Sequence, residues 1–255
     1  MTVRIRRSAV VASAAVAVVT LFAAGCGASA GDDKEPEHRS FALEGRALTV
    51  DSDDSALELV AADVDKVEVT RWFKGSVVVG GDPKVTWEMK DDTLKLREDC
   101  SGVVADCSAK HRIEVPRGIA VTVKDGDGSV RASGFKEALN VRTGDGSVRV
   151  EDSSGPLTLH TGDGSVTATD IDSRRVDVHT RDGSVRLGLA AVPDRVASSS
   201  QDGSVTIELP AEATYRVKAK TGDGSVDVSV PRDERSTHEV SAETRDGKVT
   251  VRTAN

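Results

Sequence analysis

The sequence predicts an all-β protein that folds as a single parallel β-solenoid of about ten two-stranded rungs. One observation behind this prediction is a D-G-[SK]-V core that recurs seven times. Another is that two apolar positions precede each core and two follow it, alternating with polar positions at the period of two that indicates β-strands. The aspartates of the seven copies are Asp127, Asp145, Asp163, Asp182, Asp202, Asp223 and Asp246.

The spacing of the copies indicates a repeat architecture. Successive aspartates lie 18, 18, 19, 20, 21 and 23 residues apart, and a fixed period of this size is typical of solenoids. Each repeat is expected to contain a short strand, a Gly-Asp-Gly bend and a second short strand. The unit itself keeps a constant length, so all growth of the period falls in connectors, which contain Pro156, Pro193, Pro210 and Pro231. One edge of the structure is therefore expected to be regular and the opposite edge variable.

An antiparallel β-meander is the alternative fold, because an Asp-Gly bend between alternating strands also signals a hairpin. A meander would leave one apolar face uncovered, and the sequence offers no helix to cover it. A parallel solenoid instead stacks equivalent valines between two facing sheets, so that each rung covers the apolar side chains of the next. We therefore favour the solenoid.

The region before the regular repeats follows the same pattern less closely. The offsets of a regular rung recur at Leu48, Val50, Asp54, Leu57 and Leu59, and again at Val85, Trp87, Asp91, Leu94 and Leu96. A further degenerate unit is indicated by Val67, Val69, Val77 and Val79. We expect one solenoid domain over residues 41–255, with degenerate N-terminal rungs and a cysteine loop in 41–116 and regular rungs in 117–255. The bulky Trp87 and Leu94 are expected to cap its N-terminal end.

Residues 1–25 have the layout of a lipoprotein signal peptide. Three arginines precede an apolar run over residues 9–24, which is shorter than the ~20 residues that span a membrane. The run ends at Gly25-Cys26 in a sequence that resembles a bacterial lipoprotein box. We expect lipidation at Cys26, a flexible tether over residues 26–40, and anchoring in the cell envelope on the extracytoplasmic face of the membrane. Ordinary signal cleavage stays open, because Ala23 stands where Leu or Val is commoner.

The remaining cysteines predict a disulfide, and the net charge limits the classes of partner that the chain is expected to bind. Cys100 and Cys107 form an even pair in an exported chain, so we predict a disulfide between them. Removal of residues 1–25, which carry three arginines and no acids, changes the formal net charge from −8 to −11. A chain this acidic is a poor candidate for binding nucleic acid. The expected partners are the membrane, through the lipid, and an unidentified molecule of the envelope or cell surface.

In a solenoid the seven core aspartates form a ladder along one edge, and two interpretations of it stay open. In the first, each carboxylate accepts hydrogen bonds from backbone N–H groups of its own bend. In the second, calcium bridges neighbouring carboxylates, because hard cations collect oxygen ligands. No specific calcium motif supports the second interpretation, and no other cofactor is expected.

No catalytic constellation is readable in the sequence, and we predict that the chain is not an enzyme. The serine that follows the bend recurs in six rungs, which argues against the activation of any one copy. His160 and His179 are expected on adjacent rungs, but two histidines without a carboxylate or cysteine make an incomplete metal site. A single tyrosine, Tyr215, and 3% aromatic residues disfavour a platform for stacking carbohydrate.

Several segments resemble a bacterial adhesin-like family of β-strand-repeat domains of unknown function, related to the head domains of autotransporter adhesins. These segments are VDKVEVTRW, KDDTLKLRED, IEVPRGIAVTVKDGDGSV and the repeated GDGSV. The resemblance covers roughly residues 41–255 and implies a β-solenoid at the cell envelope, with no reaction attached. We predict a non-enzymatic envelope lipoprotein that acts as a surface scaffold for a cell-wall, matrix or protein partner. The alternatives are an envelope-stress or ligand-sensing lipoprotein and a polysaccharide-active β-helix enzyme.

Overall fold

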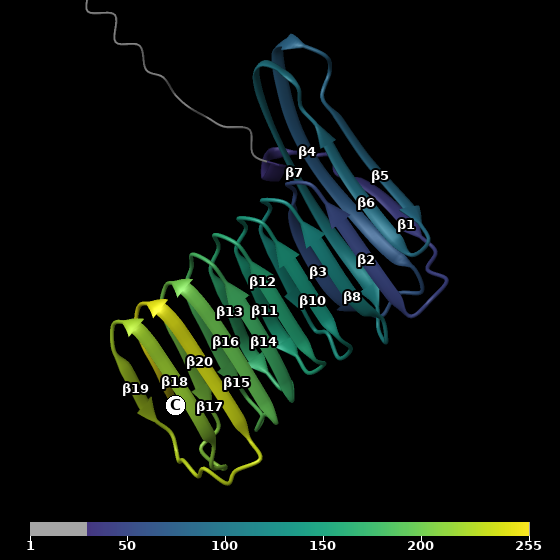
Figure 1. The fold of residues 1–255 in the computed structure, drawn as a ribbon. Coiled ribbons are helices and arrows are strands. Elements are labelled where there is room, and N and C mark those ends of the chain that lie inside the picture. The colour runs from purple at the N-terminus through teal and green to yellow at the C-terminus, as the bar shows by residue number, and fades with distance from the viewer. Residues whose placement is uncertain (1–29, 255) are drawn as a thin grey trace, which may run out of the picture.

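The computed structural model describes residues 30–254, which form two facing β-sheets and one 3-10 turn, η1 (Ala30–Asp32) (Figure 1). Sheet A contains, in spatial order, β1 (Glu37–Phe41), β4 (Val67–Gly80), β7 (Gly102–Pro116), β3 (Ala56–Ala62), β9 (Val130–Ser133), β11 (Val148–Ser153), β13 (Val166–Ile171), β15 (Val185–Leu189), β17 (Val205–Leu209), β21 (Val249–Thr253) and β19 (Val226–Ser229). Sheet B contains, in spatial order, β18 (Arg216–Asp223), β20 (Glu239–Asp246), β16 (Arg195–Asp202), β14 (Arg175–Thr180), β12 (Leu157–Thr161), β10 (Leu139–Thr143), β8 (Ala120–Asp125), β2 (Ala47–Ser52), β6 (Thr93–Asp99) and β5 (Lys84–Lys90).

The regular part of the chain is a parallel solenoid, as predicted. Each rung has one strand in sheet B, a turn that carries the D-G core, and one strand in sheet A. Equivalent residues stack in register, so that Val141 of β10 pairs with Val123 of β8 and with Leu159 of β12. Side chains along each strand alternate between buried and exposed. The inward side chains of both sheets therefore meet in one continuous core, where burial of each Val or Leu contributes ~1.5–3 kcal/mol.

The rungs do not stack in the order of the sequence. Rung β2–β3 lies between β6–β7 and β8–β9, and rung β20–β21 lies between β16–β17 and β18–β19. In the described residues nine strand pairs form rungs, close to the predicted ten, and β18–β19 ends the stack. Val217 and Val226 occupy the positions predicted for them in this last rung. Because no further rung covers it, Val226 is 45% exposed.

Two of the predicted degenerate rungs are wrong, whereas the one at Leu48–Leu59 forms β2–β3. Residues 67–80 form the single strand β4, which pairs antiparallel with β1 and β7. Strands β5 and β6 form an antiparallel hairpin within sheet B. Between them Asp91 and Asp92 have φ angles of 50° and 54°, the left-handed pair that a tight two-residue hairpin turn requires. A short meander, the alternative fold, thus adjoins the solenoid at this end.

Bulky side chains close the N-terminal end of the stack, as expected for a cap. Trp87 packs edge-on against Phe41 at 6.3 Å between ring centroids, and the guanidinium of Arg71 lies 4.3 Å from the Trp87 ring centroid. His111 is fully buried next to this cluster. Ordered structure begins earlier than residue 41, because Ala30 is buried and β1 extends sheet A beyond β4.

An antiparallel pair of long strands, β4 and β7, projects from the end of the stack (Figure 1), and β5 and β6 lie between these two strands in the sequence. Strands β4 and β7 contain 14 and 15 residues, whereas the rung strands beside them are far shorter. Pairing of β4 with β1 ends at Arg71, and pairing of β7 with β3 begins at Lys110. We call residues 73–80 and 102–109, which pair only with each other within sheet A, the hairpin arm. It extends past the edge on which the D-G turns lie.

Candidate functional site

The turns that carry the D-G core are held by a ladder of hydroxyl groups. In six of the seven regular rungs the residue two positions before the core aspartate is Thr or Ser, and its hydroxyl reaches the turn of the neighbouring rung. Thr161 Oγ1 donates to Gly146 O at 2.8 Å, and Thr180 Oγ1 donates to Gly164 O at 2.9 Å. Equivalent bonds are made by Thr143, Ser200, Thr221 and Thr244. These hydroxyls fix the spacing between successive turns.

The second glycine of the turn is required because adjacent turns lie almost in contact. A Cβ atom built on Gly146 would lie 1.8 Å from Gly128 O, and one on Gly164 would lie 2.2 Å from Gly146 O. No side chain fits at such a distance, so glycine is required for close approach of the backbone. The recurrence of this glycine therefore has a structural cause.

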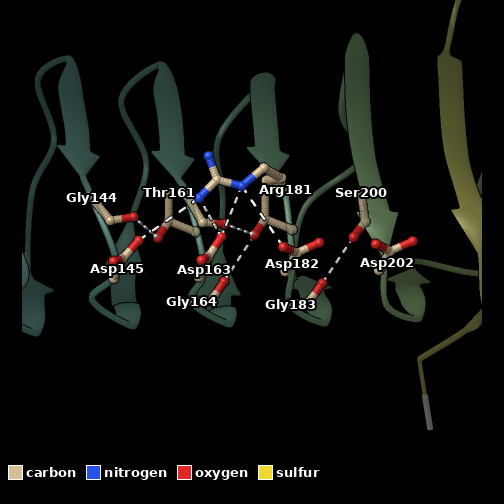
Figure 2. A network of polar contacts seen from close by, with 12 residues as sticks. Gly144, Asp145, Thr161, Asp163, Gly164, Arg181, Asp182, Gly183, Ser200 and Asp202 are labelled. Carbon is tan, nitrogen blue, oxygen red and sulfur yellow. Dashed lines mark hydrogen bonds and ion pairs between the residues drawn. The ribbon is translucent and has the colours of Figure 1, made fainter.

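The core aspartates lie along the same edge, one per rung, and their carboxylates are bridged by arginine (Figure 2). Arg181 stands where other rungs have the first glycine of the bend. Its Nε and Nη2 bind Asp163 Oδ1 at 2.9 and 2.5 Å. Its Nη2 also lies 3.9 Å from Asp145 Oδ1, and its Nε lies 3.7 Å from Asp182 Oδ2. One guanidinium thus neutralises part of the charge of three rungs.

Arg245 repeats this arrangement further along the edge. Its Nη2 binds both carboxylate oxygens of Asp202, at 2.9 and 3.0 Å, and its Nε lies 3.3 Å from Asp246 Oδ2. These bonds lower the pKa of the Asp202 carboxyl. The pKa of neighbouring Asp182 is instead raised, first by desolvation and then by its close approach to Asp202. Two guanidinium groups thus contact five of the seven core carboxylates along this edge.

The two remaining core aspartates lie at the ends of this row. The backbone N–H of Asp127 donates to Asp54 Oδ1 at 3.1 Å, and Asp54 belongs to the next rung, β2–β3. Asp223 belongs to the last rung, in register with Asp246. In residues 30–254 no group of three or more His, Cys, Asp or Glu side chains is arranged to hold a metal ion. Calcium bridging remains a hypothesis, and its test is given below.

The hydroxyl ladder and the two arginines were missed from the sequence, although both leave a signal. The letters T-G-D-G and T-R-D-G place Thr or Ser at one constant position before the aspartate. They also show where arginine replaces glycine. A row of identical hydroxyl residues at one position of a solenoid predicts side chains stacked one above another. The constant Thr or Ser therefore predicts the hydroxyl ladder, in addition to marking the start of each bend.

Asp125 is the exception in the hydroxyl ladder. It is in register with Thr143, yet it has a carboxyl group and is 9% exposed. Burial raises the pKa of Asp125 to about 7, and the nearby charges of Asp54 and Asp127 act in the same direction. A buried titratable group therefore lies where the first regular rung meets β2–β3.

On sheet B a row of basic or titratable side chains crosses four adjacent rungs, namely Lys124, Arg142, His160 and His179. The rings of His160 and His179 stack with their centroids 6.0 Å apart, and desolvation lowers the pKa of His160, with the charge of Arg142 adding to it. We call these four residues the basic row.

The predicted cysteine pair is present as a disulfide, and it ties the hairpin arm to the end of β6. Cys100 and Cys107 are bonded, with their Cα atoms 6.2 Å apart. Cys26 and the signal segment lie outside the described residues. Among residues 30–254 there is no helix with the length and apolar character needed to cross a membrane.

Comparison with known proteins identifies the family. A family model described as Toastrack DUF4097 matches residues 46–255. The chain belongs to the Toastrack DUF4097 family. The match begins before β2 and so includes every rung of the Toastrack domain, whereas η1 and β1 precede it. A comparison with curated proteins found no match.

Three solved structures are similar to this chain. A "putative adhesin" from Bacteroides fragilis NCTC 9343 is 15% identical, with a TM-score of 0.51 over 87% of this chain and 98% of that chain. A "putative adhesin" from Parabacteroides merdae ATCC 43184 is 12% identical, with a TM-score of 0.46 over 87% and 97%. A "putative cell adhesion protein" from Clostridium sporogenes ATCC 15579 is 15% identical, with a TM-score of 0.35 over 86% and 100%. At these identities, the Bacteroides structure supports the fold and carries no function.

Proposed function

We propose that this Toastrack chain is a non-enzymatic, adhesin-like scaffold of the bacterial cell envelope. It is anchored by a lipid on Cys26, and it binds an anionic polymer of the envelope through the outer face of sheet B. The observation that carries the proposal is the basic row, in which Lys124 and Arg142 are exposed and form no ion pair with any described residue, in a chain whose net charge is −8. A local excess of positive charge on an acidic protein favours an anionic ligand at that place.

The contrast with sheet A supports this assignment. Lys124 and Arg142 are exposed and make no ion pair with any described residue. Asp51, which pairs in register with Lys124, is bound instead by Arg97 at 3.0 Å. On sheet A several outward charges pair with each other, and the pairs include Arg112 with Glu58 at 2.9 Å, Arg149 with Glu151 at 4.0 Å and Arg252 with Glu208. The two cations Lys124 and Arg142 instead lie on adjacent rungs of sheet B without an ion-pair partner among the described residues.

Charge reversal on one face, with the other face as a control, tests the proposal. The double substitution Lys124→Glu and Arg142→Glu changes sheet B in the rungs β8–β9 and β10–β11. The control, Arg131→Glu with Arg149→Glu, changes sheet A in the same two rungs. The measurement is binding of each chain to purified cell wall that retains its phosphate-bearing polymers, at low and at moderate salt.

The sheet B variant is expected to bind about tenfold more weakly at moderate salt and to show a shallower salt dependence, because two counterion-releasing contacts are lost. The sheet A variant should bind like the unsubstituted chain. Equal losses in both variants, or binding unchanged after the phosphate polymers are stripped, would overturn the assignment to sheet B. Mass spectrometry of the protein recovered from membranes tests lipidation at Cys26 independently.

A further inference from the structure

The tip of the hairpin arm exposes a cluster of valines. Val78 of β4 is 72% exposed and Val79 is 62% exposed, and Val103 of β7 is 64% exposed. Val79 and Val103 are cross-strand partners. Adjacent residues of a strand point to opposite faces, so the exposure of both Val78 and Val79 shows that neither face of the tip is covered. Clustered exposed apolar side chains of this kind mark contact with another surface.

The rungs show how unusual this placement is. Outward positions of the rung strands in sheet A are polar or charged, for example Arg131, Thr167 and Arg186, whereas the valines of these strands are buried in the core. At the tip of the arm this pattern stops, and three large apolar side chains face outward next to the turn at Gly80–Pro83. The arm is not needed to complete the core, because none of its described residues belongs to the core cluster.

The start of the described chain is attached to the same arm. The backbone N–H of Ala30 donates to Ser108 Oγ at 3.3 Å, and Asp33 Oδ2 accepts from the backbone N–H of Phe73 at 3.1 Å. Ala30 lies four positions after Cys26, and four steps of extended chain reach at most ~14 Å. A lipid on Cys26 therefore cannot lie far from the arm.

The arm and the tether reach a similar distance. Ser108 and Lys74 are paired at the level of Ala30, and five residues separate them from Val103 and Val79, respectively. Five residues of strand extend about 17 Å, close to the ~14 Å that the chain from Cys26 to Ala30 can reach. If the chain from Cys26 to Ala30 extends along the arm, the lipid on Cys26 and the tip valines lie at nearly the same height above the D-G turns.

We propose that the tip valines of the hairpin arm enter the interfacial region of the membrane that holds the Cys26 lipid. This inference rests on the lipid anchoring in the proposed function. It gives the chain two points of attachment, a lipid and an apolar tip, which together fix its orientation where a lipid alone leaves it free to rotate. The strands then stand upright on the membrane, the D-G turns face it, and the long axis of the stack lies parallel to it.

The charges near the tip fit a lipid surface. Exposed charged side chains beside the valines have both signs, namely Asp82, Lys84 and Asp99, and Lys74 and Asp106 lie further down the arm. Such a mixture does not select a strongly charged partner, so apolar contact is the attraction that the tip offers. The length of arm between the β3 pairing and the tip, about eight residues or 26 Å, holds the acidic turns several Debye lengths from lipid headgroups.

A depth measurement on the full chain tests the proposal. Val79→Cys introduces a labelling site, because Cys100 and Cys107 are bonded to each other. The protein recovered from membranes with its own N-terminus is labelled there with a fluorophore and reconstituted in phosphatidylethanolamine and phosphatidylglycerol vesicles. Quenching by a nitroxide lipid is compared with quenching by aqueous iodide. The control label is placed at Arg186→Cys, an outward position of β15.

At Val79 the label should be quenched several-fold more strongly by the nitroxide lipid than at Arg186, and more weakly by iodide. Adding Val78→Asp and Val103→Asp should return the Val79 label to the control values, while Val78→Ile with Val103→Ile should not. A Val79 label as exposed to iodide as the control, in unsubstituted chains that stay bound to vesicles, overturns the proposal. A label at Val79→Cys that is shielded from both quenchers also overturns the proposal if the unlabelled Val79→Cys chains form disulfide-linked dimers. That result assigns the tip to contact with a second copy of the chain.

The Cys26→Ser variant separates this failure from failure of the anchor. If that chain stays in the membrane fraction at the unsubstituted level, the lipid is not the anchor and the proposed anchoring fails. If it is released while the unsubstituted chain is retained with a water-exposed tip, the anchor stands and the inference about the arm fails.

Discussion

Asp125 shows how one residue changes the chemistry of a repeated position. In the next rung Thr143 Oγ1 donates to the carbonyls of Gly126 and Gly128, at 2.9 and 3.3 Å. The turn of the neighbouring rung β2–β3 is related to Asp125 as the Gly126 turn is related to Thr143. Gly126 N donates to Asp53 O in the first case, and Gly144 N donates to Gly126 O in the second. Asp125 is in register with Thr143, where the hydroxyl donates to carbonyl oxygens, and a carboxylate has no proton to donate in this way. A protonated carboxyl group can replace the threonine hydroxyl, which agrees with a pKa of about 7.

The stability of the chain is therefore expected to depend on the ionisation of Asp125. Its pKa in the folded chain, about 7, lies above the ordinary value of 3.8, so the folded state binds the proton more tightly than the unfolded state. This contribution is fully present below pH 4 and is lost as the pH rises through 7. Asp125→Thr should remove that loss and stabilise the chain at pH 8 by about 1–3 kcal/mol. Urea unfolding of both chains at several pH values measures the difference.

His111 changes the stability with pH in the opposite direction to Asp125. The free energies of unfolding of the Asp125→Thr variant and the parent chain must therefore be compared at each pH. Burial lowers the pKa of His111 to about 4, and the charge of Arg71 adds to this shift. Its contribution is present above pH 6.5 and is lost as the pH falls through 4. It is common to both chains and cancels in the difference. A difference that does not change between pH 4 and pH 8 would contradict the assignment to Asp125.

Arg181 and Arg245 occupy positions that a bridging cation would need. We expect the melting temperature of the unsubstituted chain to be equal in EDTA and in millimolar calcium, because guanidinium groups already neutralise the carboxylates. In a chain with Arg181→Gln and Arg245→Gln the aspartates lose these partners, and calcium should then raise the melting temperature. Differential scanning calorimetry of both chains decides this. A calcium-dependent rise in the parent chain would restore the calcium interpretation.

At the scale of the element, the regular rungs were predictable because local and global signals agree. Alternating valines on both sides of a Gly-Asp-Gly bend predict two short strands with one apolar face. The constant length of the unit predicts that these faces stack in register, as Val148 does with Val130 and Val166. The N-terminal elements were less predictable. The offsets from Val85 to Leu96 suit a rung and a hairpin equally, and only the left-handed pair Asp91-Asp92 selects the hairpin.

The disulfide is expected to stabilise the hairpin arm more than the rungs. Cys100 and Cys107 close a short loop where β6 passes into β7, and a loop of this size contributes about 2 kcal/mol in the chain-entropy description. Cys100→Ser with Cys107→Ser should lower the free energy of unfolding by that amount and speed proteolysis between residues 76 and 106. Limited proteolysis with mass spectrometry locates the cuts. Cuts in the connectors of the regular rungs would show that the disulfide acts elsewhere.

At the scale of the whole molecule, the stacking order was not predictable from the repeats. Every rung presents similar inward valines at the same offsets, so the sequence pattern fits any neighbour. Val251 of β21 pairs with both Ile207 of β17 and Val228 of β19, and nothing in its local sequence shows that it lies between them. The order depends on how the connectors cross the end of the stack. The connector before β18 is fixed there by Tyr215, whose buried hydroxyl donates to Pro210 O at 2.8 Å.

A pair of matched substitutions tests the order. Val251 is fully buried in the structure, whereas Val228 in the last rung is only partly buried. Val251→Ala should cost about 2 kcal/mol and Val228→Ala less than half of that, because a side chain covered on one side leaves a smaller cavity. Stacking in the order of the sequence predicts the reverse. Urea unfolding of the two variants distinguishes the two orders.

The place of rung β20–β21 has a consequence for the way the protein is made. Among the described residues β18 and β19 pair only with β20 and β21, which follow them in the sequence and therefore leave the ribosome later. Rung β18–β19 has no native neighbour until rung β20–β21 has been synthesised, so until then the native stack ends at β16–β17. A nascent chain that is stopped early keeps an open apolar end, and it differs from the finished protein in a way that quality-control proteases can recognise.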